Sequence, residues 1–172
     1  AVHTIAGQAL DVSLLRRGAL PTSADLYRLY DLKTGFYSFV APLVIGALAA
    51  GAGENDAETL KTVGLNLGRA YQLRDDLEDS RRILQGRDTS RRPWELNLLA
   101  VLLGEHGEQR AAEELKNGAL PESGESAKLL NAEVPPRIER FLAAAREGTA
   151  RLALPEERRE HLAAALAEIA GL

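Results

Sequence analysis

Apolar residues recur every three to four positions along most of the chain, which is the spacing of one face of an α-helix. Strict alternation of apolar and polar residues, typical of strands, is absent. Proline and glycine lie mostly between the periodic segments. The pattern predicts an all-α fold, a bundle of about eight helices forming a single domain over residues 1–172. The expected helices cover residues 2–17, 23–33, 36–52, 55–84, 94–104, 107–117, 125–132, 136–152 and 156–170.

Particular residues set the expected ends of these helices. Thr22 or Ser23 offers the side-chain oxygen that caps a helix N-terminus. Lys33-Thr34-Gly35 is expected to separate two apolar helices. Pro135-Pro136 and Pro155 are expected to begin helices, since proline fits the first turn and breaks a helix interior.

The segment Phe36–Ala52 approaches the composition of a membrane span, because Ser38 is its only small polar interruption. Crossing a bilayer takes about 20 apolar residues, and Pro42, Gly46 and several alanines make the run only moderately hydrophobic. We therefore expect a fully buried core helix and no membrane span.

The composition narrows the class of protein. Hydrophobic residues make up 45% of the 172 residues and charged residues 27%, which is typical of a globular protein. A formal net charge of −4 argues against a nucleic-acid partner, and the absence of cysteine excludes disulfides and thiolate metal sites. A cytoplasmic location fits. The chain has no methionine and begins at Ala1 inside an apolar stretch, so we expect its start to be a cut or processed edge.

The most informative local pattern lies within residues 55–84. Gln72, Asp75, Asp76 and Asp79 are spaced i, i+3, i+4 and i+7, so all four project from one face of a helix. Stacked carboxylates repel one another, and a bound cation removes that penalty. Oxygen ligands at this spacing suit Mg²⁺, which often bridges carboxylates and substrate phosphates. The alternative is a solvated acidic face, neutralised by Arg74, Arg81 and Arg82.

Two further polar groups interrupt apolar segments. Lys33 and Thr34, beside Gly35, form a candidate phosphate-binding pair. The alternative is structural, because the helix dipole also favours a lysine at a helix C-terminus. Gln8 and Asp11 are i,i+3 neighbours on an otherwise apolar helix, where a buried polar group needs a partner. That partner is either structural or a metal-bound water.

In combination and in this order, the motifs resemble the trans-isoprenyl diphosphate synthase (polyprenyl synthetase) family. The matching residues are Gly7-Gln8-x-x-Asp11, Tyr30-x-x-Lys33-Thr34-x-x-Tyr37, Pro42-Leu43, Gly46 and Gly68-x-x-Tyr71-Gln72-x-x-Asp75-Asp76-x-x-Asp79. The last stretch is similar to the family's second aspartate-rich motif. The resemblance is strong over residues 7–79 and loose after 86. It implies the C-terminal half of a helical bundle of the isoprenoid synthase type, without its N-terminal helices.

The resemblance also implies an activity. Members of the family are Mg²⁺-dependent prenyltransferases that condense isopentenyl diphosphate with an allylic diphosphate, as geranyl, farnesyl and geranylgeranyl diphosphate synthases do. By position, it implies that Asp75 is the main Mg²⁺ ligand, with Asp76, Asp79 and Asp11 completing the metal-binding set directly or through water.

The same resemblance implies roles for the remaining polar residues. Lys33, Thr34 and Gln72 are implied as catalytic residues that also bind substrate. Lys33 would hold the allylic diphosphate, and Thr34 and Gln72 would line the path of the carbocation. Gln8 would bind substrate from the opposite wall.

The chain departs from the family pattern in two places. The first aspartate-rich motif lies upstream of the Gly-Gln segment, before Ala1, and the lysine of the loop after the second motif is missing. Arg91 or Arg92 is expected to supply that charge. We expect the chain alone to be no catalyst and to need a missing N-terminal segment or a partner that supplies the first motif. The alternatives are a non-catalytic or regulatory relative and a terpene cyclase. The family also implies a homodimer.

Overall fold

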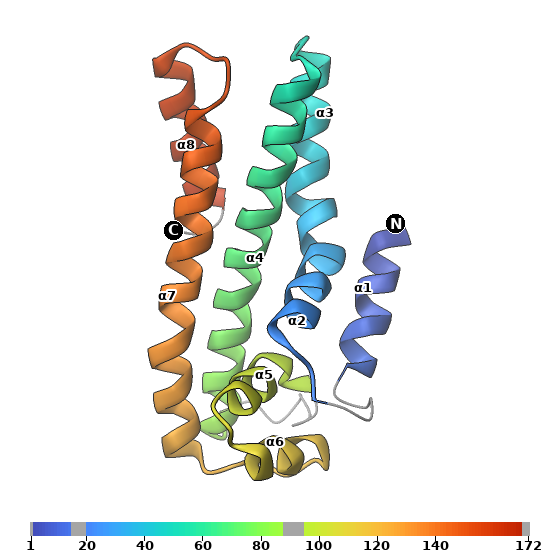
Figure 1. Cartoon of the computed structure of the whole chain (residues 1–172), viewed down its shortest axis with the longest axis vertical. Helices are drawn as coiled ribbons and strands as arrows, with labels where there is room; N and C mark the ends of the chain where they lie inside the picture. The colour runs from blue at the N-terminus through green and yellow to red at the C-terminus, as the bar shows by residue number, and fades with distance from the viewer. Residues whose placement is uncertain (1, 15–19, 88–94, 170–172) are drawn as a thin grey trace.

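The computed structural model describes residues 2–14, 20–87 and 95–169, and every regular element in them is helical (Figure 1). The predicted all-α fold is therefore confirmed. In chain order the elements are α1 (Val2–Ser13), α2 (Ser23–Tyr30), the π-helix η1 (Asp31–Val40), α3 (Ala41–Ala49), α4 (Glu54–Leu84), α5 (Asn97–Glu105), α6 (Gln109–Lys116), α7 (Ser123–Ala150) and α8 (Glu156–Ile169).

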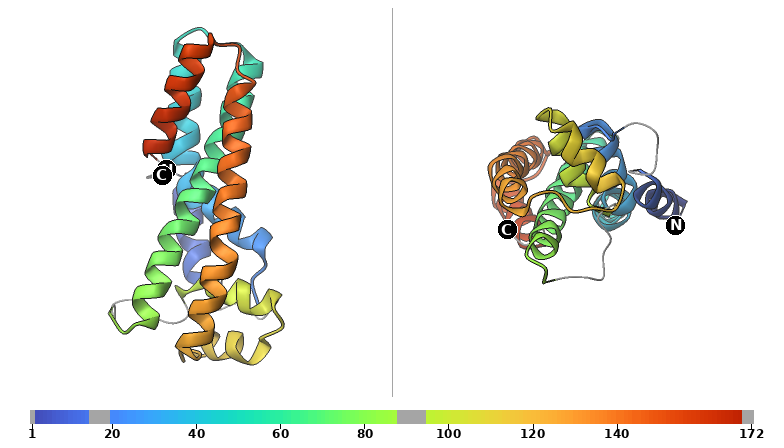
Figure 2. Two further views of the ribbon diagram at one scale, coloured as in Figure 1. Left: turned by 90° about the vertical axis from the view of Figure 1, so that its left-hand side faces the viewer. Right: turned by 90° about the horizontal axis from the view of Figure 1, so that it is seen from below.

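The core lies between the two longest helices, α4 and α7, and the α2–η1 segment. Helices α4 and α7 run side by side along most of their length (Figures 1 and 2). Their apolar periodicity explains this packing, because the buried positions recur every three to four residues on both helices. Those positions include Leu60, Val63, Leu67, Ala70, Leu73 and Leu77 on α4, and Leu130, Val134, Ile138, Phe141, Leu142 and Ala145 on α7.

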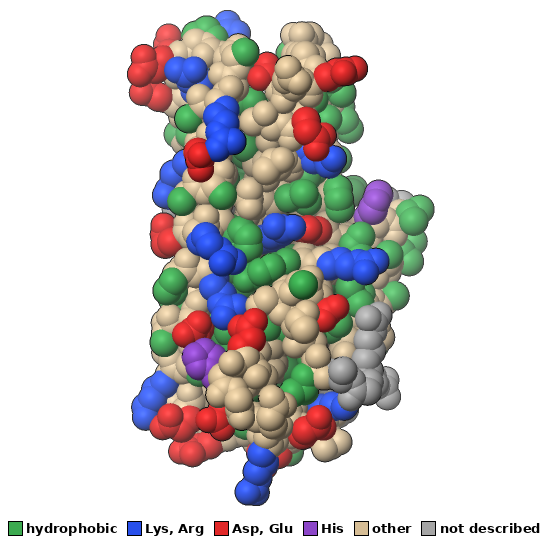
Figure 3. Space-filling model, in the orientation of Figure 1, with side chains coloured by type: hydrophobic (Ala, Val, Ile, Leu, Met, Phe, Trp, Pro, Cys, Tyr) green, Lys and Arg blue, Asp and Glu red, His purple; other side chains and the backbone are tan. Residues whose placement is uncertain are grey.

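Helices α5 and α6 lie across one end of the bundle, as the view from below in Figure 2 shows. All residues of α5 from Asn97 to Leu103 are buried, so this short helix closes the core at that end. Helix α1 lies at the opposite edge from α7, packed mainly on η1. Hydrophobic side chains gather over α1 in Figure 3, where Val2, Ile5 and Val12 are exposed.

The predicted helix start near residue 22 is confirmed in detail. Thr22 adopts an extended backbone conformation, and its side-chain oxygen accepts a hydrogen bond from the backbone N–H of Asp25. The Asp25 carboxylate in turn accepts a hydrogen bond from the backbone N–H of Thr22. This reciprocal capping box satisfies amides that a helix leaves unpaired at its first turn.

The expected break at Lys33-Thr34-Gly35 is wrong. The helix is continuous from Ser23 to Ala49, and its π-helical stretch carries these residues in the helix interior. A methyl group at Gly68 of α4 would lie 2.7 Å from the Cα of Gly35, so glycine at position 68 lets the two backbones approach closely. Gly35 lies at this helix contact and not at a helix end.

The expected helix start at Pro135-Pro136 is also wrong, because both prolines lie inside α7. A proline in a helix interior lacks an N–H and leaves the carbonyl four residues earlier without its partner. Here the affected carbonyls belong to Asn131 and Ala132, and all four residues are exposed. Water can reach these groups, so the predicted helices 125–132 and 136–152 join into one.

The expectation of a fully buried helix over residues 36–52 is wrong, because Tyr37 is exposed and α3 buries none of its residues. The continuous helix Ser23–Ala49, with a mean hydropathy of 1.5 in its most apolar window, is long and apolar enough to cross a membrane by length and composition. A core helix of a globular protein passes the same test, so the absence of a membrane span stays a prediction.

Candidate functional site

Three elements that are far apart in sequence meet where the predicted site residues lie: α1, η1 and α4. Helix α1 can approach η1 because residue 7 is glycine, where a methyl group would lie 2.6 Å from the backbone nitrogen of Lys33. Arg69 on α4 donates two hydrogen bonds to Asp31, at 2.8 and 2.6 Å, and so fixes the start of η1. We call the residues assembled at this point, Asp11, Lys33, Thr34, Gln72, Asp75 and Asp76, the site cluster.

Asp11 and Lys33 form an ion pair across the α1–η1 contact. Lys33 Nζ lies 2.9 Å from Asp11 Oδ2, and both side chains are about three-quarters buried. The polar residues on the apolar helix α1 were expected to need a partner, and for Asp11 that partner is Lys33. The pair brings Lys33, a candidate phosphate-binding residue, next to Asp11, a candidate metal ligand.

Thr34, Gln72 and Asp75 form a chain of hydrogen bonds from η1 to α4. Thr34 Oγ1 donates to Gln72 Oε1 at 2.7 Å, and Gln72 Nε2 donates to Asp75 Oδ2 at 3.4 Å. Gln72 is buried, whereas Asp75 is exposed. The buried amide therefore orients a carboxylate that solvent and a ligand can reach.

Asp76 is the most perturbed acid of the cluster. Tyr30 OH donates a hydrogen bond of 2.6 Å to Asp76 Oδ2. Burial raises the pKa of Asp76 from 3.8 to about 6, although the Tyr30 hydrogen bond and the charge of Lys33 lower it. The negative charges of Asp11 and Asp75 raise the pKa further, which reflects how closely the acids converge. Burial, then the charge of Asp76, raises the pKa of Tyr30 well above its ordinary value, so Tyr30 remains a hydrogen-bond donor.

Other residues predicted for the site lie at its margin. Asp79 is largely buried, one helical turn beyond Asp75, and lies 3.9 Å from Arg82. Gln8 is exposed on α1, and the structure records no side-chain hydrogen bond for it within the described residues. Arg91 and Arg92, predicted to replace the loop lysine, lie outside the described residues.

Mg²⁺ fits the donor set of the site cluster. Within residues 2–14, 20–87 and 95–169, no three His, Cys, Asp or Glu side chains converge closely enough to enclose a metal ion. Mg²⁺ does not require such a cage, because it is commonly held by one or two carboxylates with water and substrate phosphates as the remaining ligands. The exposed Asp75 carboxylate offers such hard oxygen ligands. So does the neighbouring Asp76, whose pKa of about 6 leaves it ionised at a higher pH.

No role was predicted for Asn97, the first residue of α5. Its Nδ2 donates to Asp11 Oδ1 at 2.9 Å, so Asn97 joins the site cluster from a fourth element. The only sequence signal was a polar residue at the start of the apolar run Leu98–Leu103.

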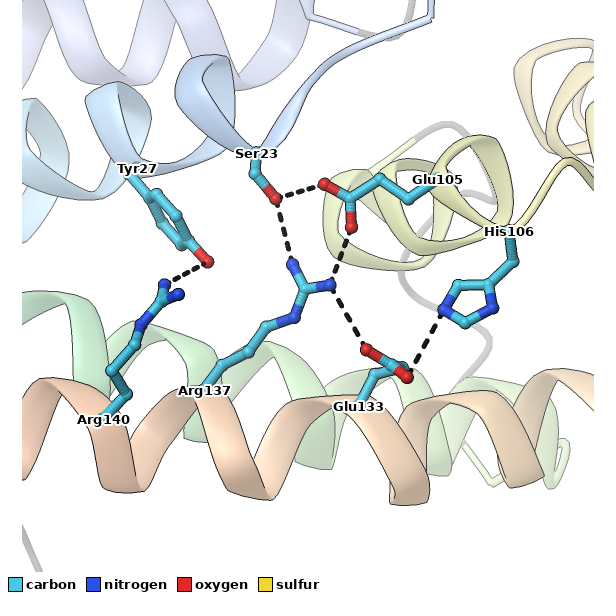
Figure 4. Close-up of polar contacts among 7 residues, drawn as sticks. All are labelled: Ser23, Tyr27, Glu105, His106, Glu133, Arg137 and Arg140. Carbon is cyan, nitrogen blue, oxygen red and sulfur yellow. Dashed lines mark hydrogen bonds and ion pairs between the residues drawn. The ribbon is translucent and has the colours of Figure 1, made fainter.

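A second polar network, which sequence reasoning also missed, joins α2, α5 and α7 (Figure 4). Arg137 donates to Ser23 at 2.9 Å, to Glu105 at 2.7 Å and to Glu133 at 3.4 Å. Ser23 donates to Glu105 at 2.5 Å, and His106 lies 3.4 Å from Glu133. We call these five residues the clamp. It fixes the last turn of α5, the helix whose first residue is Asn97.

The electrostatics of the clamp favour its charged state. Burial raises the pKa of Glu105, but the hydrogen bonds from Ser23 and Arg137 outweigh burial and hold the pKa below its ordinary value. Burial lowers the pKa of Arg137, and the hydrogen bond and charge of Glu105 more than reverse this.

Comparison with known proteins connects the site cluster to one family. Residues 1–83, which carry Asp11, Lys33, Gln72 and Asp75, match the polyprenyl synthetase family. Over 73 residues the chain is 36% identical to a geranylfarnesyl diphosphate synthase of Natronomonas pharaonis. The aligned residues make up 42% of this chain and 21% of that protein.

Solved structures extend the similarity in fold to almost the whole chain. A geranylgeranyl pyrophosphate synthase has a TM-score of 0.76 and 19% identity, covering 99% of this chain and 57% of that one. The Corynebacterium glutamicum geranylgeranyl pyrophosphate synthase complexed with isoprenyl diphosphate and magnesium has a TM-score of 0.72 and 24% identity, covering 98% and 52%. The chain thus spans about half the length of these solved synthases.

The similarity in fold includes the part of the chain beyond residue 83, where the family's sequence pattern does not match. The helical fold of the isoprenoid synthase type is therefore confirmed, and so is the resemblance predicted from the motifs: residues 1–83 match the polyprenyl synthetase family.

Proposed function

We propose that this chain carries the part of a Mg²⁺-dependent prenyltransferase that binds the allylic diphosphate. The observation that carries the proposal is the convergence of charged groups on Asp76: the charges of Lys33, Asp11 and Asp75 all act on it, and a chain of hydrogen bonds joins Thr34, Gln72 and Asp75 beside it. An ammonium group, a buried amide and an exposed carboxylate are the groups that a diphosphate with its metal ions requires. The reaction would join an allylic diphosphate to isopentenyl diphosphate, with loss of diphosphate and a proton.

Each residue has a role that follows from its surroundings. Lys33 donates to the diphosphate, and its contact with Asp11 keeps the ammonium group in place before substrate arrives. The oxygens of Thr34 and Gln72 would line the path of the allylic carbon that becomes positive, where their dipoles would stabilise the developing charge. Asp75 and Asp76, with Asp79 and Asp11 through water, would hold Mg²⁺. When bound, Mg²⁺ neutralises negative charge on the leaving diphosphate.

The test is Mg²⁺-dependent incorporation of labelled isopentenyl diphosphate into an allylic diphosphate, with this chain assayed together with the N-terminal segment or partner that supplies the first aspartate-rich motif. Asp75→Asn removes a proposed ligand, and Glu78→Gln is the matched control, since Glu78 is an exposed acid on the same helix that pairs with Arg82. We expect Asp75→Asn to abolish turnover and Glu78→Gln to preserve it. Equal loss in both variants would contradict the proposal.

A non-catalytic or regulatory subunit of such a synthase is the second candidate. This candidate predicts Mg²⁺-dependent binding of an allylic diphosphate without turnover by the 172-residue chain. Turnover by this chain alone would exclude it, and with it the expectation that the chain needs a segment or partner supplying the first aspartate-rich motif.

The proposal includes a cytoplasmic homodimer, or a complex with that partner. Light scattering of the purified chain measures its mass and separates the two: a mass of twice 18.6 kDa supports the homodimer.

A further inference from the structure

Asn97 is the residue near the site that the proposed function leaves without a role. It is almost completely buried, at 2% exposure, and stands at the start of a helix whose next six residues are all buried and apolar. Its Nδ2 donates to Asp11 Oδ1 at 2.9 Å and approaches the backbone oxygen of Asp11 at 3.4 Å. It therefore ties α5 to α1 across 86 positions of sequence.

The orientation of the Asn97 amide is fixed by its partners. Both Asp11 atoms that it meets are oxygens, so only the NH₂ group can face them. The remaining atom, Asn97 Oδ1, is buried and has no hydrogen-bond partner in the described parts of the chain. Leaving an acceptor buried and unpaired costs stability. An apolar residue would suit the packing at this position better than asparagine does.

Helix capping does not account for Asn97 either. The residue before it, Leu96, occupies the N-cap position, and the Asn97 side chain donates to α1 and not to its own helix. What the amide does is complete the coordination of Asp11. One carboxylate oxygen of Asp11 accepts from Asn97, and the other meets Lys33 Nζ at 2.9 Å.

We propose that Asn97 is a positioning residue of the diphosphate-binding site, holding the Asp11 carboxylate so that Asp11 in turn holds Lys33. The inference rests on the proposed function of Lys33. With both oxygens engaged, the Asp11 side chain has one favoured orientation, and the Lys33 ammonium group is held at the position where a diphosphate would bind. Asn97 itself does not touch the substrate.

If Asn97 is a positioning residue, its replacement should weaken binding without lowering stability. A purely structural role would not separate the two effects. Asn97→Leu replaces the amide with a side chain of similar size that suits the apolar start of α5 and removes the unpaired acceptor. Replacing an imperfectly paired buried polar group with an apolar one of similar shape is close to neutral for stability. We therefore expect an unchanged or higher melting temperature together with weaker binding.

The experiment is calorimetric titration of the 172-residue chain with inorganic pyrophosphate and Mg²⁺, as a double-mutant cycle of Asn97→Leu and Asp11→Ala. We expect Asn97→Leu to weaken affinity about tenfold, the effect of one hydrogen bond to a charged group. In the Asp11→Ala background the same change should have no further effect, since Asn97 acts through Asp11. Ser126→Ala, a change at an equally buried polar residue on α7, is the control and should bind as the unchanged chain does.

The outcomes distinguish the two proposals. Unchanged affinity of Asn97→Leu, or a loss that persists in the Asp11→Ala background, overturns the positioning role while the proposed function stands. If Lys33→Gln binds pyrophosphate as tightly as the unchanged chain, the proposed function fails and the positioning role fails with it.

Discussion

The site cluster and the clamp are both polar groups that join three or more elements of an apolar bundle, yet their electrostatics differ. In the clamp, Arg137 meets two carboxylates and holds the pKa of Glu105 below its ordinary value. In the site cluster, burial and neighbouring acids raise the pKa of Asp76 to about 6. The clamp thus favours its charged state, whereas the site cluster contains an acid whose charge the fold destabilises.

This difference separates a structural network from a binding site. Groups that complete one another within the protein add to stability and have little capacity left for a ligand. Acids that converge with too few cations near them lower stability until a ligand supplies the missing charge, and such perturbed groups are common at functional sites. Asp76 fits the second description, since Mg²⁺ and diphosphate together would supply the missing positive charge and ligands.

The largest expected effect is on Lys33. Lys33→Gln removes the ammonium group, and we expect the affinity for pyrophosphate in the presence of Mg²⁺ to fall about 10- to 100-fold, the effect of a lost charge-assisted hydrogen bond. Calorimetry measures this. The clamp variant Arg137→Met serves as the comparison and should bind normally. A similar loss in both variants would remove the distinction between the two networks.

The next largest expected effect is on the pH dependence of the free energy of unfolding, through Asp76. Because the folded pKa, about 6, exceeds the ordinary 3.8, the folded chain binds more protons between these values. Its stability therefore falls as the pH rises through this range. Asp76→Asn keeps an acceptor for Tyr30 and should be more stable than the unchanged chain by about 1–3 kcal/mol at pH 8. That gain should disappear below a pH of about 4.

Thermal unfolding at several pH values, without Mg²⁺, measures the Asp76 effect. A gain of the same size at low and high pH would show that burial does not destabilise the Asp76 charge. Thermal unfolding at pH 8 is then measured again with Mg²⁺. Metal binding should raise the melting temperature of the unchanged chain more than that of Asp76→Asn.

Loss of the clamp arginine should reduce stability and leave binding intact. Arg137→Met keeps the side-chain length and removes three hydrogen-bonded contacts, leaving Glu105 and Glu133 without that cation. We expect a loss of about 1–2 kcal/mol, or about 2–6 °C in melting temperature. The pKa of Glu105 is depressed in the folded chain, so its contribution is present at neutral pH and lost as the pH falls through that pKa. The deficit of Arg137→Met should therefore shrink in acid, and a deficit independent of pH would contradict this account.

The smallest expected effect belongs to Ser23. Ser23→Ala removes the hydroxyl that donates to Glu105 and accepts from Arg137, while the direct Arg137–Glu105 contact remains. We expect a loss of about 0.5–1 kcal/mol in the free energy of unfolding, measured in urea. A loss as large as that of Arg137→Met would mean that Ser23, and not the arginine, organises the clamp.

The sequence was sufficient to predict the helical class and the part of the site that η1 and α4 build. Periodic leucines placed α4, and the resemblance of Lys33-Thr34 and Gln72-x-x-Asp75 to the family's motifs predicted one site, whose two segments are joined by the Thr34–Gln72 hydrogen bond. Their meeting follows from two helices packing face to face, so helix periodicity carries the information. The glycine that permits the approach, Gly68, was visible in the sequence. Gly35, which lies opposite it, was misinterpreted as part of a helix end, because propensity alone cannot distinguish a glycine inside a helix from one that ends it.

Features that depend on distant partners could not be predicted in this way. Asn97 meets Asp11 across 86 positions, and Arg137 meets Glu105 across 32 and Ser23 across 114. No local pattern marks such pairs, since each residue is an ordinary polar group in its own segment. The prolines of α7 show the same limitation in another form: their tolerance depends on solvent reaching the carbonyls of Asn131 and Ala132.

Asp75 and its neighbours, if they form a metal-dependent diphosphate site, should bind inorganic pyrophosphate only when Mg²⁺ is present. Calorimetric titration with and without Mg²⁺, on the unchanged chain, Asp75→Asn and the control Glu78→Gln, measures this. We expect binding that requires Mg²⁺, is lost in Asp75→Asn and is retained in Glu78→Gln. Binding that is independent of Mg²⁺, or that survives Asp75→Asn unchanged, would show that these residues form no such site.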